Sequence, residues 1–134
     1  MSTIFERATK QYKEKIAGTI SLSIEVPEWP DEQGQASLLY FKPVNTLRFR
    51  EFSRFVELAR QQTVESALDI IILRALDENQ QAVFKPAQRA ELFRSLDPQV
   101  ILKIIRRMNE IEDNYSNEQD EAGLTAAEIA EKNF

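Results

Sequence analysis

The chain contains no cysteine and no histidine, and only three of its 134 residues are glycine. Without cysteine, neither a disulfide nor a thiolate metal site can form. Without histidine, the commonest general base and the commonest metal ligand are missing, which excludes Ser-His-Asp catalysis and ordinary zinc sites. The glycines, at positions 18, 34 and 123, are too scattered to build a phosphate-binding loop. We therefore expect that the protein is not an enzyme and binds neither a cofactor nor a metal. Its function is then expected to lie in surfaces that bind partners.

Long hydrophobic runs are missing as well. No segment has the roughly 18 consecutive apolar residues that a membrane-spanning helix requires. The first residues carry Glu6 among basic side chains and have no apolar core of signal-peptide length. We therefore expect a protein that stays in the cytoplasm where it is made and has no membrane partner.

The acidic charge is concentrated at the C-terminal end. Residues 1–107 carry sixteen basic and fourteen acidic side chains, whereas residues 108–134 carry eight acidic side chains and a single lysine, Lys132. The formal net charge of −5 therefore belongs to the last part of the chain. This distribution does not indicate a strong general affinity for nucleic-acid phosphates or anionic lipid.

Two short strands are predicted after an N-terminal segment. The alternation in residues 19–26 places one apolar face on the first strand, made of Ile20, Leu22, Ile24 and Val26. Pro27 and Pro30 cannot donate backbone hydrogen bonds, so we expect this strand to end there. A second strand is predicted over 36–42. The connection between them is longer than a tight turn, which favours antiparallel pairing without defining its register.

The rest of the chain has the three-to-four-residue apolar spacing of helices. Residues 3–16 are interpreted as a short amphipathic helix or, because their other face is basic, as a flexible arm. Further helices are predicted over 47–61 with Thr46 as N-cap, from Thr63 to about 76, from Pro86 to about 95, and from Pro98 to 113. The apolar run 70–73 also fits a buried strand, but its flanks favour a helix.

The predicted fold class is α+β and mainly α: an N-terminal β-hairpin packed on a bundle of about four helices. At 134 residues, the chain is most simply one domain. We expect residues 1–18 to form an N-terminal arm or short helix, 19–113 a single globular domain, and 114–134 an acidic, flexible tail.

The candidate partner-binding residues are Trp29, Tyr40, Phe49, Phe52, Arg106 and Arg107. Trp29 lies in a proline-flanked turn, where it either folds back as a lid on the core or serves as an exposed anchor. Phe49 and Phe52 alternate with arginines, as in a stacking platform for single-stranded nucleic acid, but their helical spacing favours the core. Arg106 and Arg107 are expected in the last turns of their helix, where the dipole favours cations.

Three features of the chain form a pattern when they are taken together. A strand ending in VPEW at 26–29 precedes a second strand and then an aromatic, charged helix. A buried helix runs into LDENQQAVF at 76–84. A final core helix is followed by a short polar terminus closing in EKN at 131–133. Over about residues 19–112, this order resembles the tail assembly chaperones of bacteriophages with long, non-contractile tails (siphoviruses). That family often has glycine in the turn where this chain has Gln80.

The resemblance implies a chaperone without catalytic residues. Such proteins bind along the helical tape measure protein and keep it soluble until tail tube subunits polymerise around it. They then leave and are not part of the finished virion. Many are also made in a longer, frameshifted form whose extension recruits the tail tube (major tail) protein. Helix-in-groove binding suits such a client, and coating a long rod with many copies leads us to expect self-association.

A small helical adaptor or regulatory protein is the alternative. Such a protein could bind nucleic acid through the basic N-terminal segment, from Arg7 to Lys15, and through the arginines at positions 48–54. The chaperone hypothesis predicts no nucleic-acid partner, so an electrophoretic shift assay at moderate salt separates the two.

Overall fold

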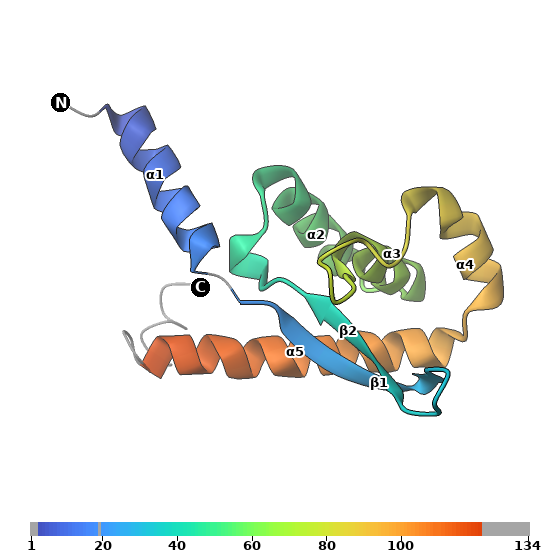
Figure 1. Cartoon of the computed structure of the whole chain (residues 1–134). Coiled ribbons are helices and arrows are strands. Elements are labelled where there is room, and N and C mark those ends of the chain that lie inside the picture. Colours follow the sequence, from blue (N-terminus) through green and yellow to red (C-terminus); the bar gives the residue numbers. More distant parts are fainter. Residues whose placement is uncertain (1–2, 19, 122–134) are drawn as a thin grey trace.

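The computed structural model describes residues 3–18 and 20–121, which form one antiparallel β-hairpin and several helices (Figure 1). The elements are α1 (Ile4–Ala17), β1 (Leu22–Pro30), β2 (Ala36–Phe41), the 3-10 turn η1 (Val44–Thr46), α2 (Phe49–Gln61), α3 (Val64–Arg74), the 3-10 turn η2 (Pro86–Gln88), α4 (Arg89–Ser95) and α5 (Pro98–Glu121). The predicted fold class, a hairpin packed on a mainly helical body, is confirmed.

The hairpin buries one face of each strand. β1 pairs with β2 in a register that places Leu22 opposite Phe41. Leu22, Ile24 and Val26 are buried, as the alternation predicted. The prediction was wrong for Ile20, which precedes the first paired residue of the strand and is 62% exposed. The connecting turn is closed by Asp31, whose carboxylate accepts two backbone hydrogen bonds of 2.9 Å.

β1 is longer than predicted. We expected the strand to end at Pro27, but it continues to Pro30, with an irregularity in the register between Val26 and Pro30. Pro27 lies inside this irregularity, where β1 has no paired residue on β2, so its missing N–H costs no hydrogen bond of the ladder. The expectation was wrong because it did not allow for an irregularity in the strand.

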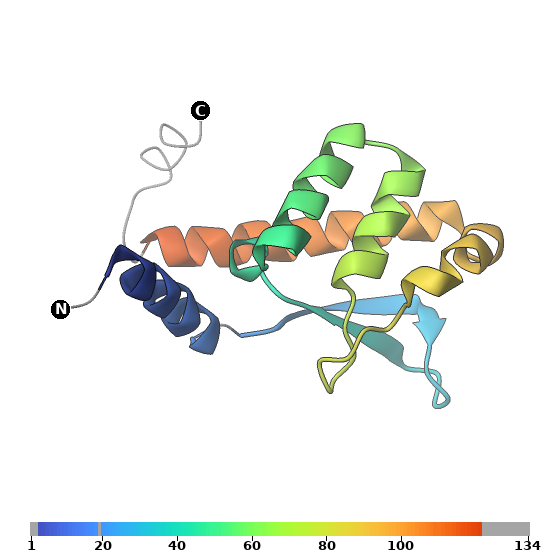
Figure 2. The same ribbon diagram turned by 90° about the horizontal axis from the view of Figure 1, so that it is seen from above.

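The long helix α5 is the element on which the others pack. β1 contacts α5 from one side and α3 contacts it from another (Figure 2). Ile104 and Met108 of α5 and Ile71 of α3 are completely buried in the core that results. The apolar run 70–73 is therefore part of a core helix, as its flanks predicted.

α5 also continues beyond the predicted end of the domain. We expected a tail from residue 114, whereas the helix extends to Glu121. Ile111 and Tyr115 pack against the core, so the apolar stripe of the helix continues past Asp113. What we expected of residues 122–134 lies outside the described residues.

Most helix starts follow the capping residues of the sequence. Thr3 caps α1 through a 3.1 Å hydrogen bond from the N–H of the third helical residue, and Thr63 caps α3 in a reciprocal capping box. Thr46 does not cap α2 as predicted. It lies in η1, where its hydroxyl donates a 2.7 Å hydrogen bond to the carbonyl of Pro43, and α2 begins later, at Phe49.

Candidate functional site

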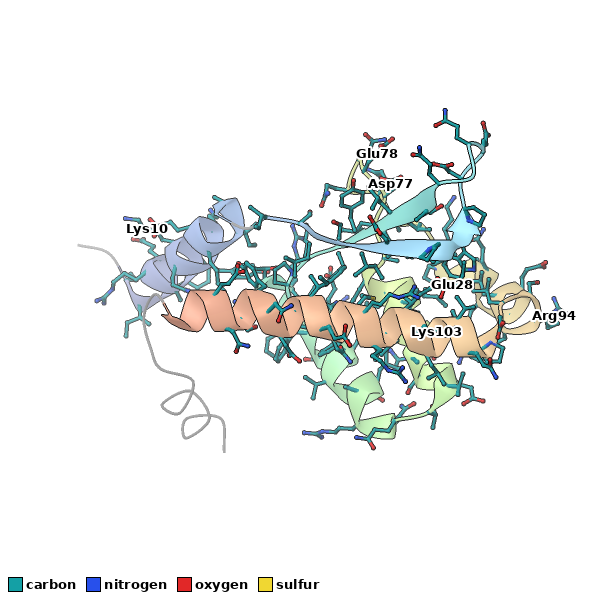
Figure 3. All side chains as sticks on the ribbon, turned by 90° about the horizontal axis from the view of Figure 1, so that it is seen from below. Lys10, Glu28, Asp77, Glu78, Arg94 and Lys103 are labelled. Atoms are coloured by element: carbon teal, nitrogen blue, oxygen red, sulfur yellow. The ribbon has the colours of Figure 1, made fainter. Side chains whose placement is uncertain are left out.

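An apolar groove of about 340 Å³ lies between α2 and α5, with α3 as its floor. Both α2 and α5 pack on α3, so their facing side chains form the two walls of the groove. Figure 3 shows α2 on one side of α5 and the hairpin on the other. The apolar lining is mainly Phe55, Leu58, Ala59, Ile70, Leu102 and Ile105. We call this feature the α2–α5 groove.

Helical spacing explains why both walls of the groove are apolar. On α2, Phe55, Leu58 and Ala59 are three and four residues apart and therefore share one face. On α5, Leu102 and Ile105 are three residues apart and line the opposite wall. α5 thus has apolar side chains both toward the core and toward the groove, a stripe wider than one neighbouring element can cover.

A buried ion pair adjoins the floor of the groove. Arg74 donates 2.7 Å hydrogen bonds to the carboxylate of Glu112 and to the carbonyl of Lys42, and only 1% of its side chain is exposed. Its guanidinium carbon lies 5.2 Å from the ring centres of both Phe41 and Phe55. Its buried Nε has no hydrogen-bond partner among the described residues. Arg74 therefore holds α3, α5 and the end of β2 together beside the groove.

Phe49 and Phe52 lie outside the core, contrary to the prediction. Phe49 is 87% exposed and Phe52 is 42% exposed, whereas Leu58 of the same helix is 2% exposed. Phe49 and Leu58 are nine residues apart, which places them on opposite sides of a helix with 3.6 residues per turn. The apolar stripe of α2 is too wide to be buried against α3 alone. Phe52, one turn before Phe55, extends the apolar surface beside the groove.

Trp29 is a lid on the core. Its side chain is half-buried, and its ring meets that of Phe84 edge to face, with centroids 6.1 Å apart and planes at 80°. Both side chains pack against the core. The backbone carbonyl of Trp29 also accepts a hydrogen bond from the hydroxyl of Ser37. Of the two interpretations drawn from the sequence, the structure matches the lid.

Arg106 and Arg107 lie in the middle of α5, and the expectation that they lie in its last turns was wrong because the helix extends to Glu121. Arg107 donates hydrogen bonds of 2.8 and 2.7 Å to the two carboxylate oxygens of Glu28. These bonds are the main reason why the pKa of Glu28 is lowered from 4.5 to about 2. Glu28 lies beside α5 in Figure 3, so this pair joins α5 to the hairpin. Arg106 is exposed.

Tyr40 connects β2 to the turn that follows α3. Its backbone N–H donates a 2.9 Å hydrogen bond to the carbonyl of Leu76, and its carbonyl accepts one of 2.7 Å from the N–H of Leu76. Leu76 forms a second antiparallel bridge with Ala82. The backbone of Tyr40 therefore has a structural role, while its side chain is half-buried.

The six candidate residues do not converge on one site. They are spread over the junction of the hairpin with α5 (Trp29, Arg107), the free side of that helix (Arg106), β2 (Tyr40) and α2 (Phe49, Phe52). The groove walls formed by Leu102 and Ile105 were missed. The signal for them was the run 100–105, where apolar residues fall on more than one helical face.

Within residues 3–18 and 20–121, no group of three or more acidic side chains is placed to hold a metal ion. In the same residues, no helix combines the length and the apolar character needed to cross a membrane. The α2–α5 groove is the candidate site because exposed apolar side chains line or adjoin both of its walls.

No protein-family model, no curated protein and no solved structure matches this chain.

Proposed function

We propose that this protein is a tail assembly chaperone of a bacteriophage with a long, non-contractile tail, and that it binds an amphipathic helix of the tape measure protein in the α2–α5 groove. The observation that carries the proposal is the groove, with two apolar walls on helices that stand apart. Leu102 on one wall is 42% exposed and Phe52 beside the other is also 42% exposed. Contiguous exposed apolar surface of this kind is typical of protein-binding sites.

The length of the groove suits a helical client. Along α5 the lining residues extend from Leu102 to Asn109, which is about 10 Å at a rise of 1.5 Å per residue. This corresponds to two turns of a bound helix, enough for apolar anchors at i, i+3 or i+4, and i+7. A long client helix would extend beyond both ends of the groove, so several copies could bind along it.

The turn after α3 also supports the proposal. Gln80 has a φ of +64°, in the left-handed region that glycine adopts most readily. The family of tail assembly chaperones often has glycine at this position of the pattern. The backbone conformation of Gln80 is thus the one that such a glycine would favour.

A chaperone of this kind would act in the cytoplasm of the bacterial host and be absent from the finished virion. It would cover the apolar stripe of the tape measure protein until tail tube (major tail) subunits replace it. A longer frameshifted form would recruit those subunits. The proposed activity needs no catalytic group, because its driving force is the removal of apolar surface from water.

One observation favours the alternative, an adaptor that binds nucleic acid. Phe49, which is 87% exposed, stands between Arg48 and Arg50, an arrangement that suits base stacking combined with phosphate contacts. Farther along α2, however, Arg54 pairs with Glu57 at 3.4 Å, so this surface carries charges of both signs. The absence of an electrophoretic shift with single-stranded and double-stranded nucleic acid at moderate salt would exclude the adaptor.

Co-expression with the tape measure protein encoded downstream tests the proposal. We expect the client to become soluble and to co-purify with many copies of the chaperone. Leu102→Glu places a charge in the groove wall and should abolish co-purification. Ser53→Glu adds the same charge at an exposed position of α2 that faces away from Phe55 and the groove, and it should leave co-purification unchanged.

Two results would contradict the proposal. If the tape measure protein stays insoluble while the co-expressed protein is free and folded, the tape measure protein is excluded as its client. Equal co-purification with the Leu102→Glu and Ser53→Glu variants would exclude the groove as the binding site of the client. Circular dichroism of both variants would establish that the comparison is made between folded proteins.

A further inference from the structure

The outer edge of β1 carries backbone groups that no other strand covers. In an antiparallel pair, the N–H and C=O of one residue point to the same side of the strand, and successive residues alternate. Tyr40 uses both of these groups to bond to Leu76, so they point away from β1. The groups of Ser23, which lies opposite Tyr40, therefore point away from β2, and so do those of Glu25. In the described part of the chain, no strand lies on this side of β1.

A contact with α5 agrees with this direction. Arg107 donates a 3.4 Å hydrogen bond to the backbone carbonyl of Glu25, so this carbonyl faces α5 and not β2. The bond is long and therefore weak, and a carbonyl oxygen has a second lone pair for another donor. The edge thus offers the N–H and C=O groups of Ser23 and Glu25, two residues that are about 7 Å apart along the strand. Pro27 has no N–H and ends this series.

A groove of about 520 Å³ follows this edge. It is lined by residues 23–25 and Pro27 of β1, by Leu38 of β2, and by Arg107, Glu110 and Ile111 of α5. Figure 3 shows β1 beside α5. We call this feature the β1 edge groove. An extended peptide that adds a strand to a sheet binds to an exposed edge of this kind.

The β1 edge groove is acidic. Glu25 and Glu110 are exposed, and neither forms an ion pair within residues 3–18 and 20–121. Arg107, which also lines the groove, is already paired with the carboxylate of Glu28. The groove therefore has two carboxylates without a cationic partner, a charge that complements basic side chains.

We propose that an extended segment of another protein, with basic and apolar side chains at alternate positions, pairs with the outer edge of β1 in this groove. Successive side chains of a strand lie on opposite faces. The basic side chains would lie beside Glu25, and the apolar ones would contact Ile111 of α5. Main-chain hydrogen bonds give the affinity, and the alternation gives the specificity. This binding goes beyond the chaperone function and does not depend on it.

A second copy of this chain suits the groove less well than a basic partner does. If two copies paired through their β1 edges, Glu25 and Glu110 of one copy would lie close to the same residues of the other. Like charges placed together in this way are destabilising. The charge of the groove therefore favours a basic segment of a different protein.

The β1 edge groove and the α2–α5 groove lie on opposite sides of α5. Ile111 lines the first and Leu102 lines the second. These residues are nine positions apart, which corresponds to half a turn beyond two full turns of a helix with 3.6 residues per turn. A substitution in one groove can therefore be tested without touching the other.

Binding of a synthetic peptide to the full-length protein tests the proposal. The probe is a labelled heptapeptide of alternating lysine and valine with blocked ends, and fluorescence anisotropy measures its affinity. We expect saturable binding that weakens as salt is raised. A peptide with glutamate in place of lysine should not bind. A lysine peptide with every amide N-methylated has the same charge and no N–H, and it should bind at least about tenfold more weakly.

Two substitutions of Ser23 separate its backbone from its side chain. Ser23→Pro removes an N–H that points away from β2, so it should abolish peptide binding and leave the pairing with β2 intact. Ser23→Ala keeps this N–H and should bind the peptide like the wild type. Circular dichroism establishes that both variants are folded.

A matched pair of charge reversals tests the acidic lining. Glu25→Lys should weaken peptide binding at least about tenfold, because it replaces attraction by repulsion beside the bound segment. Glu32→Lys makes the same change of charge at an exposed position in the turn of the hairpin, outside the groove, and should bind nearly like the wild type.

Other results would overturn the proposal in distinguishable ways. A wild type that does not bind the lysine peptide would exclude a site for basic strands. If the N-methylated peptide or the folded Ser23→Pro variant binds equally well, the contact is between charges alone and no strand is added. If Leu102→Glu loses the peptide, the peptide lies in the α2–α5 groove. If Ser23→Pro lowers the oligomer mass in light scattering, the edge pairs with a second copy.

Co-expression with the tape measure protein separates this inference from the proposed function. Ser23→Pro should lose the peptide and still solubilise the client, whereas Leu102→Glu should lose the client and still bind the peptide. If the folded Ser23→Pro variant loses both, the edge belongs to the client site and a separate partner is excluded. If Leu102→Glu keeps both, the client site is wrong and the β1 edge groove stands.

Discussion

Arg74 and Glu112 form an ion pair of 2.7 Å beside the α2–α5 groove, with 1% and 14% of their side chains exposed. The second carboxylate oxygen of Glu112 accepts a hydrogen bond from the backbone N–H of Val44. One carboxylate of α5 is thereby bonded to α3 and to the turn that follows the hairpin. Because Arg74 also lies over the ring of Phe55, the pair positions one groove wall.

Removing Arg74 should be strongly destabilising. Arg74→Ala leaves the carboxylate of Glu112 without its charged partner, and breaking a buried pair in this way costs about 3–5 kcal/mol. Urea unfolding followed by circular dichroism measures the loss. Arg60→Ala, an exposed arginine on α2, should change stability by less than about 0.5 kcal/mol. If the two variants were equally stable, the ion pair would have no role in holding the groove.

The Glu28–Arg107 pair should make stability depend on pH in the acid range. The pKa of Glu28 is lowered from 4.5 to about 2 in the folded protein, mainly by the hydrogen bonds from Arg107. The unfolded chain therefore binds a proton at a higher pH than the folded protein does. The stability from this pair is fully present above about pH 5 and is lost as the pH falls through 4.5 toward 2.

A comparison of the wild type with Glu28→Gln isolates this contribution. The difference between their unfolding free energies should be constant above about pH 5 and should shrink as the pH approaches the folded-state pKa. Denaturant unfolding at a series of pH values measures it. A difference that stays constant over the whole range would show that the ion pair does not form in solution.

Truncation of two apolar residues of α2 should affect stability to very different extents. Leu58 is 2% exposed, and Leu58→Ala should lower the unfolding free energy by about 2–5 kcal/mol, because it creates a buried cavity. Phe49 is 87% exposed, and Phe49→Ser should change the unfolding free energy by less than about 0.5 kcal/mol. Thermal unfolding of both variants measures the contrast. A large loss with Phe49→Ser would restore the original prediction that this residue belongs to the core.

Trp29 is the only tryptophan in the chain, so its fluorescence reports on the lid. Phe84→Ala removes the ring against which it packs and should shift the emission of Trp29 to longer wavelength. Binding of the tape measure protein in the α2–α5 groove should leave the emission nearly unchanged, because Trp29 does not line the groove. A marked shift on client binding would revive the interpretation of Trp29 as an anchor.

The predictions that succeeded depend on residues close together in the sequence. The helix predicted from Thr63 begins there because Thr63 caps α3 through a hydrogen bond from the backbone N–H of Ser66, three residues away. The alternation in β1 was readable because it repeats every two residues. These features need no information about the rest of the fold.

The failed predictions for Phe49 and Phe52 depend on neighbours that are distant in the sequence. Phe49 and Phe52 have the spacing of a core stripe, and only the position of α3 decides that Leu58 is buried in their place. The groove wall at Leu102 likewise exists because α2 stands apart from α5. Periodicity shows that a face is apolar, but not which element covers it.

The sequence by itself determined which chemical groups the protein lacks and where most of its local elements form. A chain without cysteine or histidine has neither thiolate nor imidazole groups in any fold, and caps and strand alternation are set by near neighbours along the chain. Only the tertiary structure decided which apolar surfaces remain uncovered: Ile4 and Phe5 of α1, the outer aromatics of α2 and the groove between α2 and α5. The physical reason is that burial belongs to pairs of packed elements, and those pairs are set by long-range contacts such as that between Arg74 and Glu112.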